Sequence, residues 1–263
     1  MARFCPLYSS SRGNCTYIGG ASGAILIDVG VSAKKVEEAL RGIDVDINSI
    51  GAIFVTHEHT DHIQGLRVFA SRHKIDVYAS PGTLEALESK QVLNGAFEAK
   101  AINSDRVEVC GMSVSSFPTN HDAVESVGYR VLTPDERTIS ITTDTGMVSP
   151  ENLEGMLGSD LVMLESNHDI NMLMCGPYPY VVKRRVLSEL GHLSNEACAA
   201  TALTLLENGT TRFVLGHLSQ NNNLPALALE TTRSLFEQEG AKEGEDYLLQ
   251  VAGDFCENEM IVL

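Results

Sequence analysis

The length, composition and charge of the chain bound its class before any motif is considered. Its 263 residues, 43% hydrophobic and 21% charged, fit an ordinary globular protein with one hydrophobic core. The net charge of −16 disfavours loose binding to nucleic acid or anionic membranes, although bound cations could still attract a phosphate-bearing substrate into a cleft. With no run of roughly 20 apolar residues and no secretory signal after Met1, we expect a cytoplasmic protein without a membrane contact.

Strands and helices alternate in the expected secondary structure. The first part predicts strands at 15–18, 24–29, 49–56 and 76–79 and helices at 34–41, 65–74 and 81–90. The middle predicts strands at 106–118, 126–133, 138–143 and 161–165 and a helix at 149–157. The last part predicts helices at 179–190, 194–207 and 224–239 and strands at 212–215, 246–252 and 259–263. This order indicates one domain over residues 1–263, with two sheets and outer helices.

A cluster of metal-ligand side chains follows the apolar strand that ends at Val55. His57, His59, Asp61 and His62 place three imidazoles and a carboxylate within six residues. Such groups are rarely buried together without partners, and they suit zinc, manganese or iron. His57 and His59 alternate and could point the same way, whereas Asp61 and His62 could turn toward a second ion.

Three more ligand-type residues stand where later strands end: His121, Asp144 and His217. Together with the first cluster they complete a site for two divalent ions. Two ions about 3.5–4 Å apart need a bridging oxygen, which a carboxylate such as Asp144 can supply. Such ions lower the pKa of a water to about 7 and neutralise charge on a carbonyl or phosphoryl oxygen. The cofactor is therefore expected to be zinc, with manganese or iron as alternatives.

The H-x-H-x-D-H pattern at 57–62, preceded by Asp28 at the end of another apolar strand, resembles the metallo-β-lactamase superfamily. The resemblance implies an α/β fold, a four-layer αββα sandwich with the site at the edge between the sheets. It implies that His57, His59 and His121 hold one metal, that Asp61, His62 and His217 hold the other, and that Asp144 bridges them. Asp28 would brace the ligand loop.

A narrower resemblance covers nearly the whole chain. The segments 9–14, 121–123, 165–169, 176–180, 191–195 and 216–222 resemble the YycJ/WalJ family, whose members are described as 5′-to-3′ DNA exonucleases. Ser11-Arg12 departs from the family, in which a Ser-Ser pair is commoner. Because this N-terminal loop could approach the ions, Arg12 and Asn14 are candidate substrate contacts.

The last third of the chain also resembles ribonuclease Z. That resemblance implies that His192 protonates the leaving oxygen and that Glu165 orients His192; with Asp61 they form the expected catalytic set. Ser194 can cap the following helix, which would place His192 on a defined turn. The alternative is that His192 only bonds backbone near that cap.

Several other side chains have two interpretations each. His168 either lines the site or lies in a surface loop. Lys183 and Arg185 either contact substrate phosphates or form a solvated helix face. His73 is interpreted as a solvated residue, the methionines at 172 and 174 as a flexible apolar lid, and the six cysteines mostly as small buried hydrophobic residues.

The leading functional hypothesis is a phosphodiester hydrolase, a nuclease that acts from DNA 5′ ends with His192 as the acid. One alternative is a small-substrate hydrolase of the same fold, such as a cyclic phosphodiesterase or a glyoxalase-II-like thioesterase; the acidic balance favours it. A second alternative is a non-catalytic metal-binding regulatory protein. The oligomeric state is left open.

Overall fold

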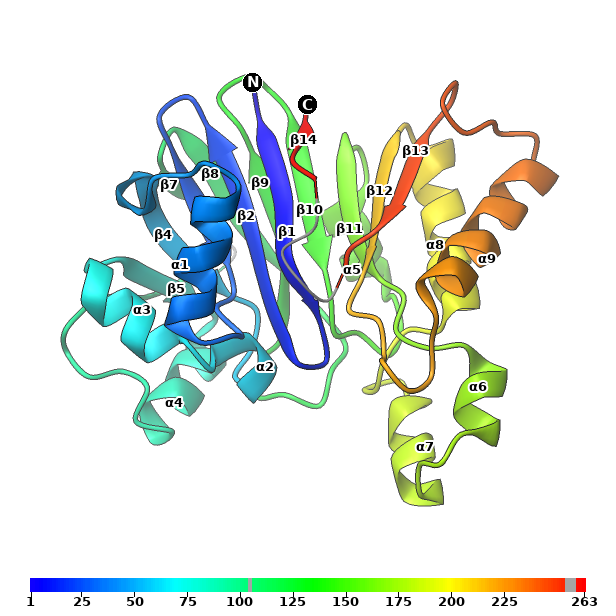
Figure 1. Ribbon diagram of the computed structural model, residues 1–263, viewed down its shortest axis with the longest axis horizontal. Helices are drawn as coiled ribbons and strands as arrows, with labels where there is room; N and C mark the ends of the chain where they lie inside the picture. The colour runs from blue at the N-terminus through cyan, green and yellow to red at the C-terminus, as the bar shows by residue number, and fades with distance from the viewer. Residues whose placement is uncertain (104–105, 254–258) are drawn as a thin grey trace.

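The computed structural model describes residues 1–103, 106–253 and 259–263, which form two seven-stranded sheets packed face to face (Figure 1). In spatial order the first sheet contains β14 (Ile261–Val262), β1 (Arg3–Ser10), β2 (Gly13–Gly20), β3 (Gly23–Ile27), β4 (Ile50–Val55), β5 (Asp76–Ala79) and β6 (Ala99–Ala101). The second contains β13 (Leu248–Val251), β12 (Arg212–Gly216), β11 (Leu161–Glu165), β10 (Thr138–Thr142), β9 (Val127–Leu132), β8 (Met112–Pro118) and β7 (Val107–Val109).

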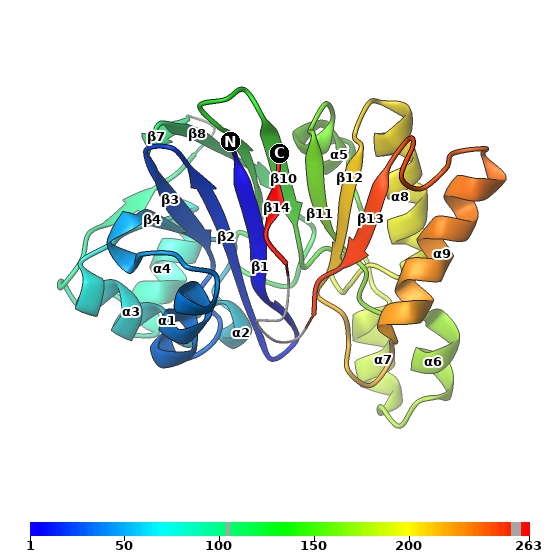
Figure 2. The same ribbon diagram turned by 45° about the horizontal axis from the view of Figure 1, so that its top comes forward.

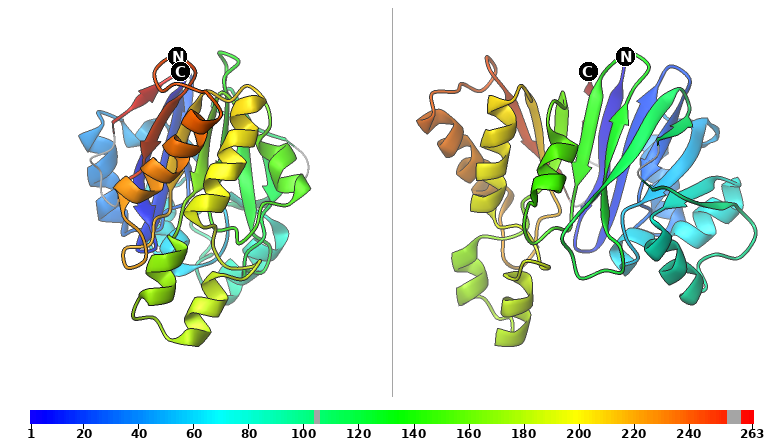
Figure 3. Two further views of the ribbon diagram at one scale, coloured as in Figure 1. Left: turned by 90° about the vertical axis from the view of Figure 1, so that its right-hand side faces the viewer. Right: turned by 180° about the vertical axis from the view of Figure 1, so that it is seen from behind.

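Helices cover the outer face of each sheet, which makes the four-layer αββα sandwich (Figure 2). The first sheet carries α1 (Ala33–Gly42), α3 (Leu66–His73) and α4 (Pro81–Ser89), and the second carries α5 (Pro150–Met156), α8 (Asn195–Glu207) and α9 (Pro225–Gln238). The short helices α2 (Thr60–Ile63), α6 (Ile170–Cys175) and α7 (Tyr180–Val186) lie at the edge opposite the termini. In both views of Figure 3, α6 and α7 project beyond that edge. A single 3₁₀ turn covers Ile47–Ser49.

The central strands are apolar throughout because both of their faces are buried. In β4, Ala52 and Phe54 belong to the core between the sheets, whereas Ile53 and Val55 pack against the helices of the first sheet. The same alternation holds in β11, and it explains why these strands appear in the sequence as continuous hydrophobic runs. No helix among the described residues is long and apolar enough to cross a membrane.

Most expected elements are present, and the exceptions have physical causes. The expectations did not include β1, where Pro6 breaks the strand pattern; Pro6 lies at a register shift between β1 and β2, where a bulge tolerates proline. Nor did they include β6 or α6. The strand expected over 106–118 is a hairpin, because Cys110 and Gly111 both adopt positive φ. The helix expected over 179–190 ends at Val186.

Candidate metal centre

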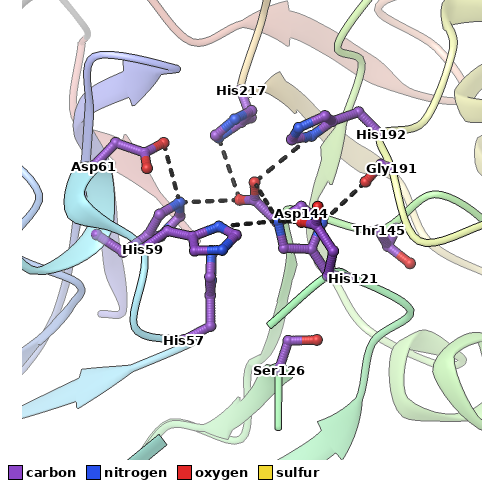
Figure 4. Close-up of polar contacts among 12 residues, drawn as sticks. His57, His59, Asp61, His121, Ser126, Asp144, Thr145, Gly191, His192 and His217 are labelled. Atoms are coloured by element: carbon purple, nitrogen blue, oxygen red, sulfur yellow. Dashed lines mark hydrogen bonds and ion pairs between the residues drawn. The ribbon is translucent and has the colours of Figure 1, made fainter. Parts of the chain in front are cut away.

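The sandwich brings the ligand-type residues to one edge, because the strands that carry them end there. His57 follows β4, Asp144 follows β10 and His217 follows β12. His121 lies just after β8, which runs parallel to β10 through the intervening antiparallel β9. Residues far apart in the sequence therefore face one another in a compact cluster (Figure 4).

One half of the cluster consists of His57, His59 and His121. Their nearest ring nitrogens all lie within 4.8 Å of one another. Nδ1 of His59 is 3.2 Å from Nε2 of His121, and the ring of His57 lies 4.6 Å from that of His59. The set is three imidazole nitrogens converging on one point, which is a ligand arrangement suited to a divalent cation.

The other half consists of Asp61, His62 and His217, whose ligand atoms also lie within 4.8 Å of one another. Asp144 lies between the halves. Its Oδ2 is 3.0 Å from Nε2 of His62 and 3.3 Å from Nδ1 of His217, and its Oδ1 is 3.7 Å from Nε2 of His121. One carboxylate thus reaches both groups, as a bridging ligand must.

The protonation chemistry of the cluster fits bound cations. Burial, followed by the neighbouring His62, lowers the pKa of His57 well below its usual value and favours the neutral form that ligates metals. Its Nε2 is buried with no hydrogen-bond partner among the described residues. Burial would raise the pKa of Asp144, but His217 and His62 hold it well below its usual value. These residues therefore form a centre for divalent metal ions.

Asp28 fixes the orientation of His62. Its Oδ2 is 2.7 Å from Nδ1 of His62, so Nε2 of that ring faces the centre. The same carboxylate accepts hydrogen bonds from the amide and the hydroxyl of Thr56, at 2.8 and 2.9 Å. The sequence reasoning missed Thr56, although its position directly before His57 was a signal.

Two further contacts hold ligands and were not foreseen. Ser9 Oγ accepts a hydrogen bond from the amide of His217, at 2.8 Å, across 208 positions of sequence. Nδ1 of His121 donates to the carbonyl of Gly191, at 3.0 Å. Asp28, Asp144 and His217 also adopt left-handed backbone angles, with φ of 62°, 57° and 53°. Such conformations in non-glycine residues are uncommon and gather at functional sites.

His192 and Glu165 form a pair beside the centre. Nδ1 of His192 lies 2.7 Å from Oε1 of Glu165. Glu165 is fully buried, and its Oε2 accepts a hydrogen bond from the amide of Thr145, at 2.8 Å. The ring of His192 stacks on that of His217 with centroids 5.4 Å apart. Burial lowers the pKa of His192, but the charge and hydrogen bond of Glu165, together with Asp144, raise it to about 9. Two residues after His192, Ser194 caps the helix α8.

The candidate substrate contacts fall in different places. Asn14 touches the centre, since its Nδ2 lies 3.1 Å from Nε2 of His62 and its Oδ1 lies 3.3 Å from Nδ1 of His217. Arg12 is exposed at the turn between β1 and β2. Arg185 forms a two-point ion pair with Asp122, whereas Nζ of Lys183 donates to the carbonyl of Met174, 2.6 Å away.

Two interpretations need correction. His168 is 1% exposed, so the surface-loop alternative is wrong; neither of its ring nitrogens has a partner among the described residues. His73 is half-buried and contacts Glu37 at 3.0 Å, so it is not simply solvated. Met172 and Met174 lie in the helix α6, in which Leu173 is buried, and their role as an apolar lid stays a prediction.

Two mixed sheets with a histidine- and aspartate-rich centre at their shared edge define the class as a binuclear metallo-hydrolase fold of the metallo-β-lactamase type. Residues 24–218 match the model of the beta-lactamase superfamily domain. The chain is 37% identical over 247 residues to exodeoxyribonuclease YycJ of Bacillus anthracis, covering 93% of this chain and 92% of that one. It is 34% identical to exodeoxyribonuclease WalJ of Streptococcus pneumoniae, with the same coverage. The chain therefore belongs to the YycJ/WalJ family of the beta-lactamase superfamily.

Solved structures agree with the fold. The metallo-beta-lactamase fold protein YhfI from Bacillus subtilis superposes with a TM-score of 0.74 at 15% identity, covering 99% of this chain and 98% of that chain. The short form of human tRNase Z superposes with a TM-score of 0.64 at 17% identity, covering 99% and 98%. At these identities the likeness establishes the architecture alone.

Proposed function

We propose that this chain is a metal-dependent hydrolase of DNA phosphodiester bonds that works as an exonuclease from the 5′ end. The observation that carries the proposal is the hydrogen-bonded pair of His192 and Glu165 beside the metal centre. The exodeoxyribonucleases that match 93% of this chain support DNA as the substrate. An acid at this position serves a reaction whose leaving oxygen needs a proton.

The ligands divide into two sets that share a carboxylate. His57, His59 and His121 would hold one ion, Asp61, His62 and His217 would hold the other, and Asp144 reaches residues of both sets. Imidazole and carboxylate ligands without cysteine fit zinc, manganese and iron alike, and zinc is the first candidate. When bound, the ions would supply a water-derived nucleophile at neutral pH and neutralise charge on the phosphate. Asp61 thereby belongs to both the ligand set and the catalytic set.

His192 holds the proton that the leaving oxygen takes. Its Nδ1 is engaged by Glu165, so Nε2 is the nitrogen that can donate to substrate. Glu165 is itself fixed by the amide of Thr145, which keeps the imidazole in one orientation. The charge and hydrogen bond of Glu165 raise the pKa of His192, which favours the protonated form that an acid needs. Asn14 lies against both His62 and His217 and is placed to contact the scissile phosphate.

A small-substrate hydrolase of the same fold is the second candidate, and the net charge of −16 favours it because a duplex would be repelled away from the centre. The pair of His192 and buried Glu165 beside the ligands counts against a non-catalytic metal-binding protein, because such a protein needs no proton donor there. Cys110, Cys175 and Cys198 are free thiols, which supports action in a reducing compartment such as the cytoplasm.

The test is hydrolysis of a 5′-phosphorylated DNA duplex by the protein loaded with manganese or zinc. Metal-dependent release of nucleotides from a 5′ label before a 3′ label supports the proposal. His192→Ala should slow DNA cleavage by about 10²–10⁴-fold. It should affect bis(p-nitrophenyl) phosphate far less, because p-nitrophenolate leaves without a proton. His73→Ala, outside the centre, is the matched control. Turnover of the nitrophenyl ester without DNA cleavage would favour a small substrate instead.

A further inference from the structure

A small cavity of about 80 Å³ lies next to the metal centre on the side of Asn14. Its walls come from three parts of the chain: the turn between β1 and β2, the start of α1, and the loop that follows β12. They include Ser10, Arg12, Gly13, Val31, Lys35 and Gln220. None of these residues is a ligand of the proposed centre, and the proposed reaction uses none of them.

The charge of this cavity is unusual for the chain. Arg12 and Lys35 are its two charged side chains, and both are cations, although the chain has 35 acidic residues and only 19 lysines and arginines. Two other cavities combine one cation with two carboxylates: Arg212 with Glu245 and Asp246, and Lys74 with Asp76 and Glu98. Within the described residues, neither Arg12 nor Lys35 forms an ion pair.

The start of α1 adds to the positive potential. Ser32 caps this ten-residue helix, and its first turn contains no acidic residue. The amides of a helix N-terminus and the helix dipole favour an anion there. Lys35 belongs to this first turn, so the helix end and one of the two cations face the same space.

The position of the cavity relative to the centre is fixed by close backbone packing. Asn14, the neighbour of Gly13, reaches the carbonyl of Asp61 at 3.3 Å and Nε2 of His62 at 3.1 Å. A Cβ on Gly30 would lie only 1.7 Å from the carbonyl oxygen of Asp61. A Cβ on Gly13 would lie 2.3 Å from Cγ1 of Val31. These contacts leave no room for the cavity wall to shift away from the metal ligands.

We infer that this cavity binds a phosphate group of the substrate strand next to the phosphate that is cleaved. The charged groups that line it, Arg12 and Lys35, are opposite in sign to a phosphate. An Arg and a Lys pair is the usual means by which proteins hold phosphate oxygens. The bound group is either the terminal 5′-phosphate or an internal phosphate of the strand. This inference rests on the proposed function.

The test compares the metal-loaded wild type with Arg12→Gln/Lys35→Gln and with the control Lys34→Gln/Arg41→Gln. The control removes the same charge from α1, where Lys34 is 82% exposed and pairs with Glu38 outside the cavity. Losing the cavity cations should raise KM for duplex DNA about tenfold, as expected for hydrogen bonds to a charged group. It should also reduce the slope of log KM against log salt by about 0.9, since one phosphate contact is lost. KM for bis(p-nitrophenyl) phosphate, which has a single phosphate, should not change.

Substrates with and without a 5′-phosphate distinguish the two sources of the group. If removing the 5′-phosphate costs the wild type tenfold and costs the cavity variant nothing, the terminal phosphate occupies the cavity. If the KM of the variant rises equally for both substrates, an internal phosphate occupies the cavity. Equal KM and equal salt slope in the variant and the control would overturn the inference while leaving the nuclease proposal intact. A wild type that cleaves no DNA would remove both.

Discussion

His121, a proposed metal ligand, donates a hydrogen bond from its Nδ1 to the carbonyl of Gly191, the residue directly before His192. The adjacent residue Asp122 strengthens this connection, because its amide donates to the carbonyl of Leu190 at 3.0 Å and its carboxylate pairs with Arg185. The loop that holds a metal ligand and the loop that holds the proposed acid are therefore joined at three points. We therefore expect a change in one loop to alter the geometry of the other.

Replacing Arg185 with Gln should lower kcat for DNA about two- to fivefold with little change in metal content. The Arg185 side chain is 57% exposed, and exposed ion pairs typically contribute about 0.2–1 kcal/mol. The expected effect is a displacement of His192 and not unfolding, so the melting temperature should stay nearly constant. Arg184→Gln is the matched control, since Arg184 is exposed on the same helix. An equal loss of activity in both variants would indicate a general effect of charge on DNA binding.

The pair of Glu165 and His192 predicts a specific pH dependence. The acid must be protonated, so activity should fall as the pH rises through the pKa of His192. Because Glu165 raises that pKa, Glu165→Gln should move the basic limb of kcat/KM to lower pH. Bound cations would lower the pKa in both proteins, so the prediction concerns the difference between them. Steady-state rates measured from about pH 6 to about pH 10 give this limb for both proteins. A basic limb at the same pH in the wild type and in Glu165→Gln would contradict the proposed role of His192.

Asp28 offers a test of metal binding that leaves every ligand in place. Asp28→Asn keeps the shape of the side chain but loses the charge that orients His62. Changes to such supporting carboxylates typically lower metal affinity about 10–100-fold. Chelator competition followed by elemental analysis measures the change directly. As a control, Asp46→Asn removes a carboxylate that only caps the 3₁₀ turn, and it should leave the affinity unchanged.

The metal motif and most of the fold were predictable because their signals are local. The ligands at 57–62 are contiguous, and β4 and β11 are apolar over their full length. Contacts between distant segments were not predictable, such as that of Ser9 with His217 or the meeting of Arg12 with Lys35 from α1. The segment 9–14 resembles the family, but nothing in it indicates that Ser9 contacts His217, and nothing around Lys35 indicates that it lines a cavity with Arg12; only the packing of the β1–β2 turn against α1 and β12 brings these residues together.

Removing the metals should destabilise the folded chain. The centre holds Nδ1 of His59 and Nε2 of His121 only 3.2 Å apart, and Nε2 of His57 is buried with no partner among the described residues. Burial of such groups is unfavourable unless something compensates them. A ligand that binds only the folded state contributes about 2.7 kcal/mol at 100 times its dissociation constant. Thermal unfolding of the chelator-treated protein should therefore occur at a lower temperature, and added zinc should restore the original melting temperature.

His57→Ala should show a smaller rise in melting temperature with zinc, whereas His73→Ala should respond like the wild type. A melting temperature that changes with neither chelator nor zinc would contradict the proposal of a metal centre.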